Sequence, residues 1–118
     1  MRPLPKILAG VAPALLVLAL LVAGAAVASA QEAVSLAISI RNHRFEPAEL
    51  HAPANRPIVL RIKNLDSTPA EFESVRLRVE KVIAANSEGT INLRPLSPGR
   101  YEFFDDFHQS TRGALVVQ

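Results

Sequence analysis

The chain has no cysteine, and its one methionine is Met1. No disulfide can form, although small exported domains often depend on disulfides to supplement a thin core. The same absence excludes thiolate ligands, which soft metal ions such as Cu(I) prefer. A folded domain must therefore rely on its hydrophobic core, with a metal ion or a partner subunit as the remaining sources of support.

Charged residues are also missing from Ile7 to Ala28, a stretch that Arg2 and Lys6 precede. The stretch ends in the small residues Ala28-Ser29-Ala30, which is the layout of a secretory signal peptide. The apolar run is long enough to span a bilayer, so an uncleaved anchor is the alternative. We expect residues 1–30 to be removed, with the cut between Ala30 and Gln31, and the 31–118 domain to be periplasmic.

The chain lacks an excess of charge of one sign. It has 13 Lys and Arg against 11 Asp and Glu, and removal of Arg2 and Lys6 leaves 11 against 11. Nucleic-acid binding would require a basic stripe with interleaved aromatic residues, and none is present. The remaining 88 residues suffice for one domain and are too few for two.

Alternation of apolar and polar residues is the main structural signal. It runs through residues 34–40 and 58–63, which is typical of strands with one buried face. Shorter segments at 70–74, 75–80, 91–93, 101–103 and 115–117 also predict strands, and turn-forming residues separate them. Residues 82–85 form one helical turn at most. The pattern predicts an all-β sandwich or barrel.

Three groups of residues have metal-binding chemistry. In an extended segment Glu71 and Glu73 point to one side while Phe72 points into the core. Asp105, Asp106 and His108 lie among aromatic residues, and His43 follows the first strand. Each group also has an interpretation that involves no metal. The two glutamates can pair with Arg76, Arg78 or Lys63 on a polar face, the aspartates can be turn residues, and His43 can be a surface histidine.

A family resemblance favours the metal-binding interpretation. Residues 98–105, His108 and residues 113–117 resemble the C-terminal signature of cupredoxins, in which a Pro-Gly turn and a Tyr-x-Phe strand precede a ligand loop. Asn64-Leu65-Asp66 resembles the family's Asn-x-Asp segment, and residues 40–48 resemble its first strand followed by Phe-x-Pro. The resemblance implies a Greek-key β-sandwich, cupredoxin-like, over residues 31–118.

The departures from the cupredoxin pattern concern its ligands. Asp105 stands where the family has its cysteine, Glu71 stands near the position of its first histidine, and no methionine lies near Thr111. His108 is retained. A blue-copper centre needs a thiolate and two imidazoles, so the sequence excludes one. Carboxylates and imidazoles instead suit iron or a non-blue copper.

The carboxylates also resemble those of a subgroup, the cupredoxin-like periplasmic components of bacterial iron-uptake systems. This resemblance implies iron as the metal, with Cu(II) as the alternative, and a membrane iron permease and other periplasmic components as partners. Ferroxidase-type oxidation of Fe(II) and a homodimer stay open. A copper chaperone and a metal-free interaction module are the other interpretations. The implied ligands are Glu71, Asp105 and His108, with Glu73, Asp106 and His43 as further ligands or their support, and Glu80 as an outside candidate.

Overall fold

The computed structural model describes residues 31–118, and the signal peptide expected over residues 1–30 lies outside them. Within the described residues no helix has the length and hydrophobicity that a membrane crossing requires. Nine strands make up this part of the chain: β1 (Val34–Arg41), β2 (Arg44–Glu46), β3 (Glu49–Ala52), β4 (Ile58–Asn64), β5 (Ala70–Ser74), β6 (Val79–Ile83), β7 (Glu88–Leu93), β8 (Gly99–Asp105) and β9 (His108–Val117).

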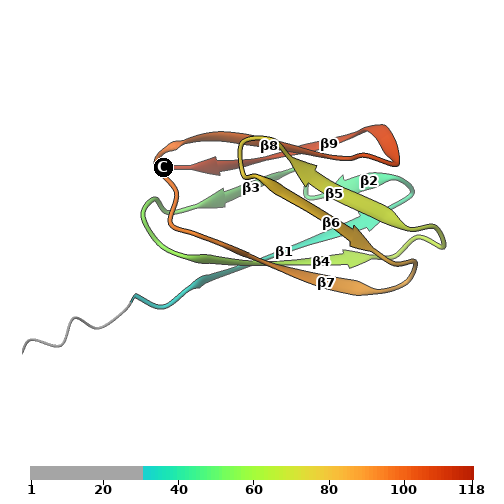
Figure 1. Cartoon of the computed structure of the whole chain (residues 1–118), viewed down its shortest axis with the longest axis horizontal. Coiled ribbons are helices and arrows are strands. Elements are labelled where there is room, and N and C mark those ends of the chain that lie inside the picture. The colour runs from blue at the N-terminus through green and yellow to red at the C-terminus, as the bar shows by residue number, and fades with distance from the viewer. Residues whose placement is uncertain (1–30) are drawn as a thin grey trace, which may run out of the picture. The chain divides into compact units, whose positions relative to one another are not determined.

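The strands form two sheets that face each other (Figure 1). One sheet has the order β2-β1-β4-β7, and the other has the order β3-β9-β8-β5-β6. Most neighbouring strands are antiparallel, but β1 pairs with β4 and β3 pairs with β9 in parallel, so the chain crosses between the sheets. This arrangement confirms the predicted all-β sandwich.

The core lies between the two sheets and follows from the alternation in the sequence. In β4, Ile58, Leu60 and Ile62 point inward and are almost fully buried, while the residues between them face outward. Three aromatic rings fill the middle of the core. Phe103 packs edge-on against Phe45, with ring centroids 4.9 Å apart, and lies 4.8 Å from Phe72. Such contacts add to the stabilisation that comes from burial alone.

The strand predicted over residues 75–80 is wrong for residues 75–78, and its last two residues, Val79 and Glu80, begin β6. β5 ends at Ser74, and residues 75–78 form a turn in which the Arg78 amide donates to the Val75 carbonyl at 3.2 Å. Arg78 has a φ of 57°, and Val75 is 78% exposed. Ser74 stabilises the turn, because its hydroxyl accepts a hydrogen bond from the Leu77 amide and donates one to the Glu102 carbonyl. The helical turn allowed for residues 82–85 is also absent, since β6 extends to Ile83.

Candidate functional site

Three carboxylates converge on the outer face of the five-stranded sheet. Glu71 and Glu73 project from β5 away from the core, while Phe72 between them is fully buried, as the sequence predicted. Asp106 follows β8, and its amide donates to the Glu71 carbonyl at 2.9 Å. One oxygen from each of Glu71, Glu73 and Asp106 lies within 4.8 Å of the others. We call these three residues the carboxylate cluster.

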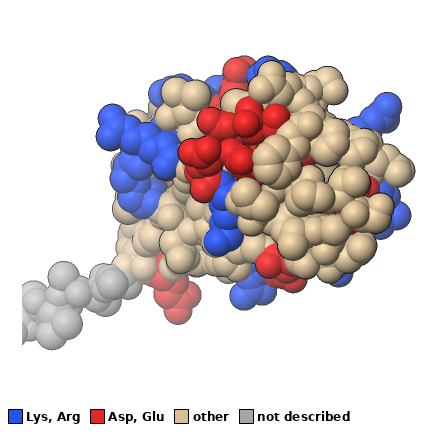
Figure 2. All heavy atoms as spheres, turned by 45° about the vertical axis from the view of Figure 1, so that its right-hand side comes forward, with Lys and Arg blue, Asp and Glu red and all other residues tan. Residues whose placement is uncertain are grey.

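A fourth carboxylate borders the cluster, because Glu80 of β6 is the cross-strand partner of Glu73. Like charges at directly opposed positions destabilise a sheet. The proposed pairing of the glutamates with Arg76, Arg78 or Lys63 is not observed, since no ion pair of residues 31–118 includes a carboxylate of the cluster or Glu80. Figure 2 shows acidic side chains gathered together on one face of the molecule.

The crowding of these acids changes their proton affinity. The pKa of Glu71 is raised above its usual value of 4.5, first by a side-chain hydrogen bond with Glu80, then by partial desolvation and nearby negative charges. The pKa of Glu73 is raised by desolvation and by the charges of Asp106 and Glu80. The nearby carboxylates add to each shift, because they oppose a further negative charge at Glu71 and at Glu73. A bound cation would offset this repulsion between the carboxylates.

Asp105 has a different environment, because its side chain is only 1% exposed. Its Oδ1 accepts hydrogen bonds from the Glu71 amide at 2.9 Å and from the Phe107 amide at 3.0 Å. Its Oδ2 lies 3.0 Å from Nδ1 of His108. The carboxyl group thus connects β5 to the turn after β8, and it helps to hold the backbone of the cluster residue Glu71 in place.

His108 and His43 form a second group beside Asp105. Their rings stack with centroids 3.9 Å apart and an interplanar angle of 28°. His43 has a φ of 56°, and its amide donates to the Asp66 carboxylate at 2.9 Å. Its carbonyl accepts a hydrogen bond from the Thr111 hydroxyl of β9. We call His43 and His108 the histidine pair.

Asp66 holds the backbone of His43, although it was not among the ligands predicted from the sequence. Its carboxylate accepts hydrogen bonds from the amides of Asn42 and His43. Burial raises the pKa of Asp66, but these two hydrogen bonds and the nearby His43 and His108 outweigh it, so the pKa is lowered overall. The Asn-x-Asp segment is its signal in the sequence. Asn64 of that segment is buried and donates to the Thr68, Ile83 and Ala84 carbonyls.

The structure therefore divides the six predicted ligands into two groups. Glu71, Glu73 and Asp106 form the carboxylate cluster, whereas Asp105, His108 and His43 lie together beside it. That Glu71, Asp105 and His108 bind one metal directly stays a prediction. The aromatic residues near Asp105 and Asp106 differ in burial. Phe103 is buried, but Phe104 is half-buried and Phe107 is 47% exposed.

Comparison with known proteins gives the family. The profile of the cupredoxin-like domain matches residues 13–117. This chain belongs to the cupredoxin-like domain family. Its sequence is also 41% identical over 80 residues to an uncharacterized protein of Rickettsia prowazekii, a match that covers 68% of this chain and 64% of the relative's length. The match therefore spans less than two thirds of the relative's length.

Solved structures of other proteins share the fold of this domain. The metal-binding domain of the Streptococcus pneumoniae Cu(I)-exporting P-type ATPase CopA, with Cu(I), has a TM-score of 0.67 at 17% identity and covers 76% of this chain and 91% of its own. A reduced Cu(I) form of an amicyanin mutant has a TM-score of 0.57 at 18% identity. The match covers 77% of this chain and 87% of the amicyanin chain. The purple cupredoxin of Nitrosopumilus maritimus has a TM-score of 0.54 at 20% identity. The match covers 70% of this chain and 98% of the purple cupredoxin.

A blue-copper centre does not fit this cupredoxin-like domain. The chain has no cysteine to supply the thiolate, and Asp105 stands where the resemblance to cupredoxins places that cysteine. The oxygens of Asp105 already accept two amide hydrogen bonds and contact His108. The carboxylate cluster fits a hard cation instead, because it offers three oxygen donors that no basic side chain of residues 31–118 neutralises.

Proposed function

We propose that this cupredoxin-like domain binds iron at the carboxylate cluster and delivers it to a membrane iron permease. The observation that carries the proposal is the convergence of Glu71, Glu73 and Asp106 within 4.8 Å, with no basic partner among residues 31–118. Carboxylates are hard donors suited to hard cations. Because negative charge favours Fe(III) over Fe(II), the cluster would also make oxidation of bound iron easier.

Delivery requires a site that can both hold and release its metal. The cluster residues are half-buried, so one side of a bound ion would stay open to a partner. The turn that ends β8 places Asp106 at the surface, where a permease could compete for the ion. The permease and the periplasmic location rest on the resemblance to iron-uptake components and on the sequence of residues 1–30.

Titration of the 31–118 domain with anaerobic Fe(II) tests the cation site. This part of the chain contains both sheets and the core between them. We expect Glu71→Gln and Glu73→Gln each to weaken binding by about tenfold or more, since each removes one charged ligand. Glu88→Gln is the matched control, because Glu88 is exposed on β7 of the other sheet. Iron affinity that is unchanged in both cluster variants would contradict the proposal.

A second candidate function is Cu(II) binding at the histidine pair. Imidazole suits copper. Nδ1 of His108 faces Asp105 at 3.0 Å and Nδ1 of His43 faces Asp66 at 3.6 Å, which leaves both Nε2 atoms for a metal. Copper binding that is lost in His108→Gln and kept in Glu73→Gln would favour this function. Binding of neither metal by a folded domain would favour a metal-free interaction module.

A further inference from the structure

The outer face of the five-stranded sheet has acidic groups on one side of Phe104 and basic groups on the other. Glu80 pairs with Glu73 across β6 and β5, Glu73 pairs with Phe104 of β8, and Phe104 pairs with Arg112 of β9. These four residues occupy one row across the sheet. Since neighbouring strands lie about 4.8 Å apart, the backbones at Glu73 and Arg112 are roughly 10 Å apart.

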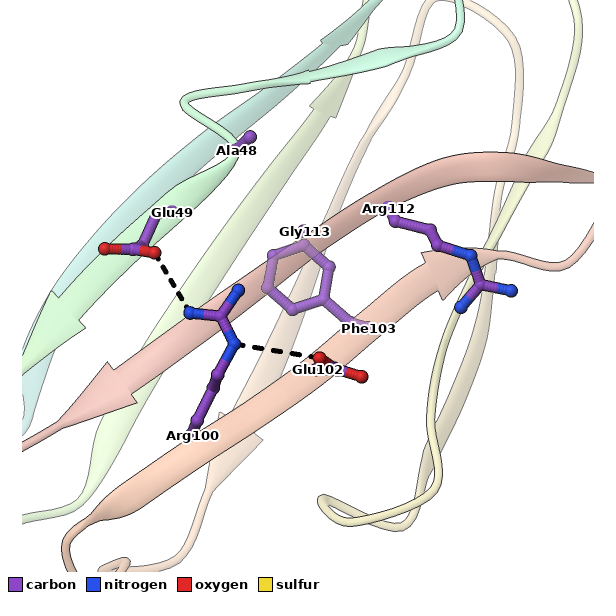
Figure 3. A pocket seen from close by; sticks show the side chains of 7 residues that line it. All are labelled: Ala48, Glu49, Arg100, Glu102, Phe103, Arg112 and Gly113. Atoms are coloured by element: carbon purple, nitrogen blue, oxygen red, sulfur yellow. Dashed lines mark hydrogen bonds and ion pairs between the residues drawn. The ribbon is translucent and has the colours of Figure 1, made fainter.

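The guanidinium of Arg112 has an aromatic ring as its neighbour. It lies 5.1 Å from the centroid of Phe104, and among the ion pairs of residues 31–118 none includes Arg112. Arg100 differs, because it contacts Glu49 at 3.1 Å and Glu102 at 3.7 Å (Figure 3). Arg112 therefore keeps its planar set of N–H donors for another anion.

Arg76 adds a second positive charge that pairs with no carboxylate of residues 31–118. Its Nη1 donates to the Arg100 carbonyl at 2.6 Å, and its guanidinium lies 4.5 Å from the centroid of the Tyr101 ring. These two contacts hold the side chain in place while leaving its charge uncompensated. Arg76 and Arg112 thus approach the same part of the sheet from the β5–β6 turn and from β9.

These arginines line a hollow of about 400 Å³. Its wall contains three arginines and a single carboxylate, Glu102, which Arg100 already contacts. Val75 and Phe104 supply the apolar part of the wall. The volume is within the range of small-molecule sites. A smaller hollow of about 240 Å³ shares Arg100, Glu102 and Arg112 with it (Figure 3). The excess of positive charge selects an anion, and the size selects a small one.

We propose that this hollow binds a small polycarboxylate anion, which completes the coordination of the cation held by the carboxylate cluster. The second half of this proposal rests on the proposed function, whereas the anion site stands without it. Three half-exposed carboxylates leave positions open on a hard cation that takes about six oxygen ligands. A polycarboxylate can fill those positions with one end and reach Arg112 with the other.

Charge predicts how the two sites influence each other. Without a metal, the carboxylate cluster repels an anion that approaches Arg112 past Phe104. A bound cation removes this repulsion and adds attraction, so the metal should strengthen anion binding. By linkage the anion must strengthen metal binding by the same factor.

Calorimetric titration of the metal-free 31–118 domain with citrate, at low ionic strength, tests the anion site. We expect Arg112→Gln to weaken citrate binding by about tenfold, because a guanidinium–carboxylate contact is lost. Arg61→Gln is the charge-matched control, since Arg61 is exposed on β4 of the other sheet, and it should bind as the unchanged domain does. Absence of citrate binding, or equal affinity in Arg112→Gln, would overturn the anion site.

The same titration with Mn(II) present tests the coupling. We expect Mn(II) to tighten citrate binding by about tenfold, within the usual range for coupled sites. This gain should disappear in Glu73→Gln, while metal-free citrate binding persists. Citrate binding that depends on Arg112 in a domain that binds no metal would refute the proposed function and support the anion site. Mn(II) binding without any change in citrate affinity would refute the coupling.

Discussion

Glu73 of β5 lies directly opposite Glu80 of β6, so two carboxylates occupy one cross-strand position on the outer face of the sheet. Opposed like charges destabilise a strand pair. The sheet keeps them next to Glu71 and Asp106, without a basic residue of the described chain in an ion pair with any of the four. This arrangement costs stability in the absence of a cation, and it has measurable consequences.

The first consequence concerns the stability of the metal-free domain. Glu73→Gln should raise the free energy of unfolding at neutral pH, because it removes one charge from the group and keeps the shape of the side chain. Urea unfolding of the two proteins measures this effect, with Glu88→Gln as the control. If Glu73→Gln unfolds at a lower urea concentration than the unchanged domain, the repulsion is not the dominant interaction of this side chain.

The second consequence is a pH dependence with a definite sign. The pKa values of Glu71 and Glu73 are raised in the folded domain above their usual 4.5. Between that value and the raised pKa, the folded state holds protons that the unfolded state has released, so stability falls as pH rises through this window. Unfolding measured across the window should show a shallower dependence in Glu73→Gln. If the stability of Glu73→Gln falls with pH as steeply as that of the unchanged domain, Glu73 does not contribute to this pH dependence.

Asp66 should contribute the opposite dependence at lower pH. Its pKa is lowered below the usual 3.8, because the amide hydrogen bonds outweigh desolvation. A lowered carboxyl pKa gives stability that is present above 3.8 and is lost as pH falls through the folded pKa. Acid unfolding of Asp66→Asn should therefore begin from a lower stability and depend less on pH below 3.8. A variant that loses stability in acid as steeply as the unchanged domain would refute this role.

Asp105→Ala should destabilise the domain by about 2–4 kcal/mol, because the Glu71 and Phe107 amides lose their acceptor. Asp105→Asn keeps an acceptor oxygen and should lose less stability than Asp105→Ala. Urea unfolding compares the two. Equal stability of Asp105→Ala and the unchanged domain would show that the carboxyl group does not hold this turn. Because Asp105 accepts these structural hydrogen bonds, variants of Glu71 and Glu73 are the better probes of metal binding.

The contact between Gly113 and the ring of Phe103 gives a packing prediction. A Cβ at Gly113 would lie 2.5 Å from Phe103 Cε1 and 2.8 Å from the Ala48 carbonyl oxygen. Gly113→Ala should therefore cost about 1–3 kcal/mol through overpacking. Gly99→Ala is the matched control, since its Cβ would meet nothing closer than 3.6 Å. Thermal unfolding compares the stability of the two variants. A Gly113→Ala domain as stable as Gly99→Ala would contradict the packing argument.

The sequence predicted the sandwich well because its strands alternate strongly. In β4 and β5 the alternation alone predicts which residues face the core, so Phe72 was placed inside and Glu71 and Glu73 outside. The alternation continued through residues 75–80, where Ser74 and the positive φ of Arg78 produce a turn. That turn brings Glu80 opposite Glu73, so their pairing depends on a feature that periodicity cannot reveal.

The burial of Asp105 was not predicted, although it follows the alternation of β8, in which Tyr101, Phe103 and Asp105 are buried. The two adjacent aspartates were predicted to be ligands or turn residues, yet Asp105 ends the strand and points into the domain, and Asp106 points to the cluster. Their different roles follow from the register of β8 against β5, in which Asp105 pairs with Phe72. Long-range pairing of this kind is set by the whole sheet and not by neighbouring residues.

The location of a bound metal tests the central claim most directly. Crystals of the 31–118 domain grown with Fe(II) under anaerobic conditions would reveal the ion by anomalous diffraction at the iron absorption edge. Our account predicts a peak between the carboxylates of Glu71, Glu73 and Asp106. A peak beside His43 and His108, with none at the carboxylate cluster, would contradict it.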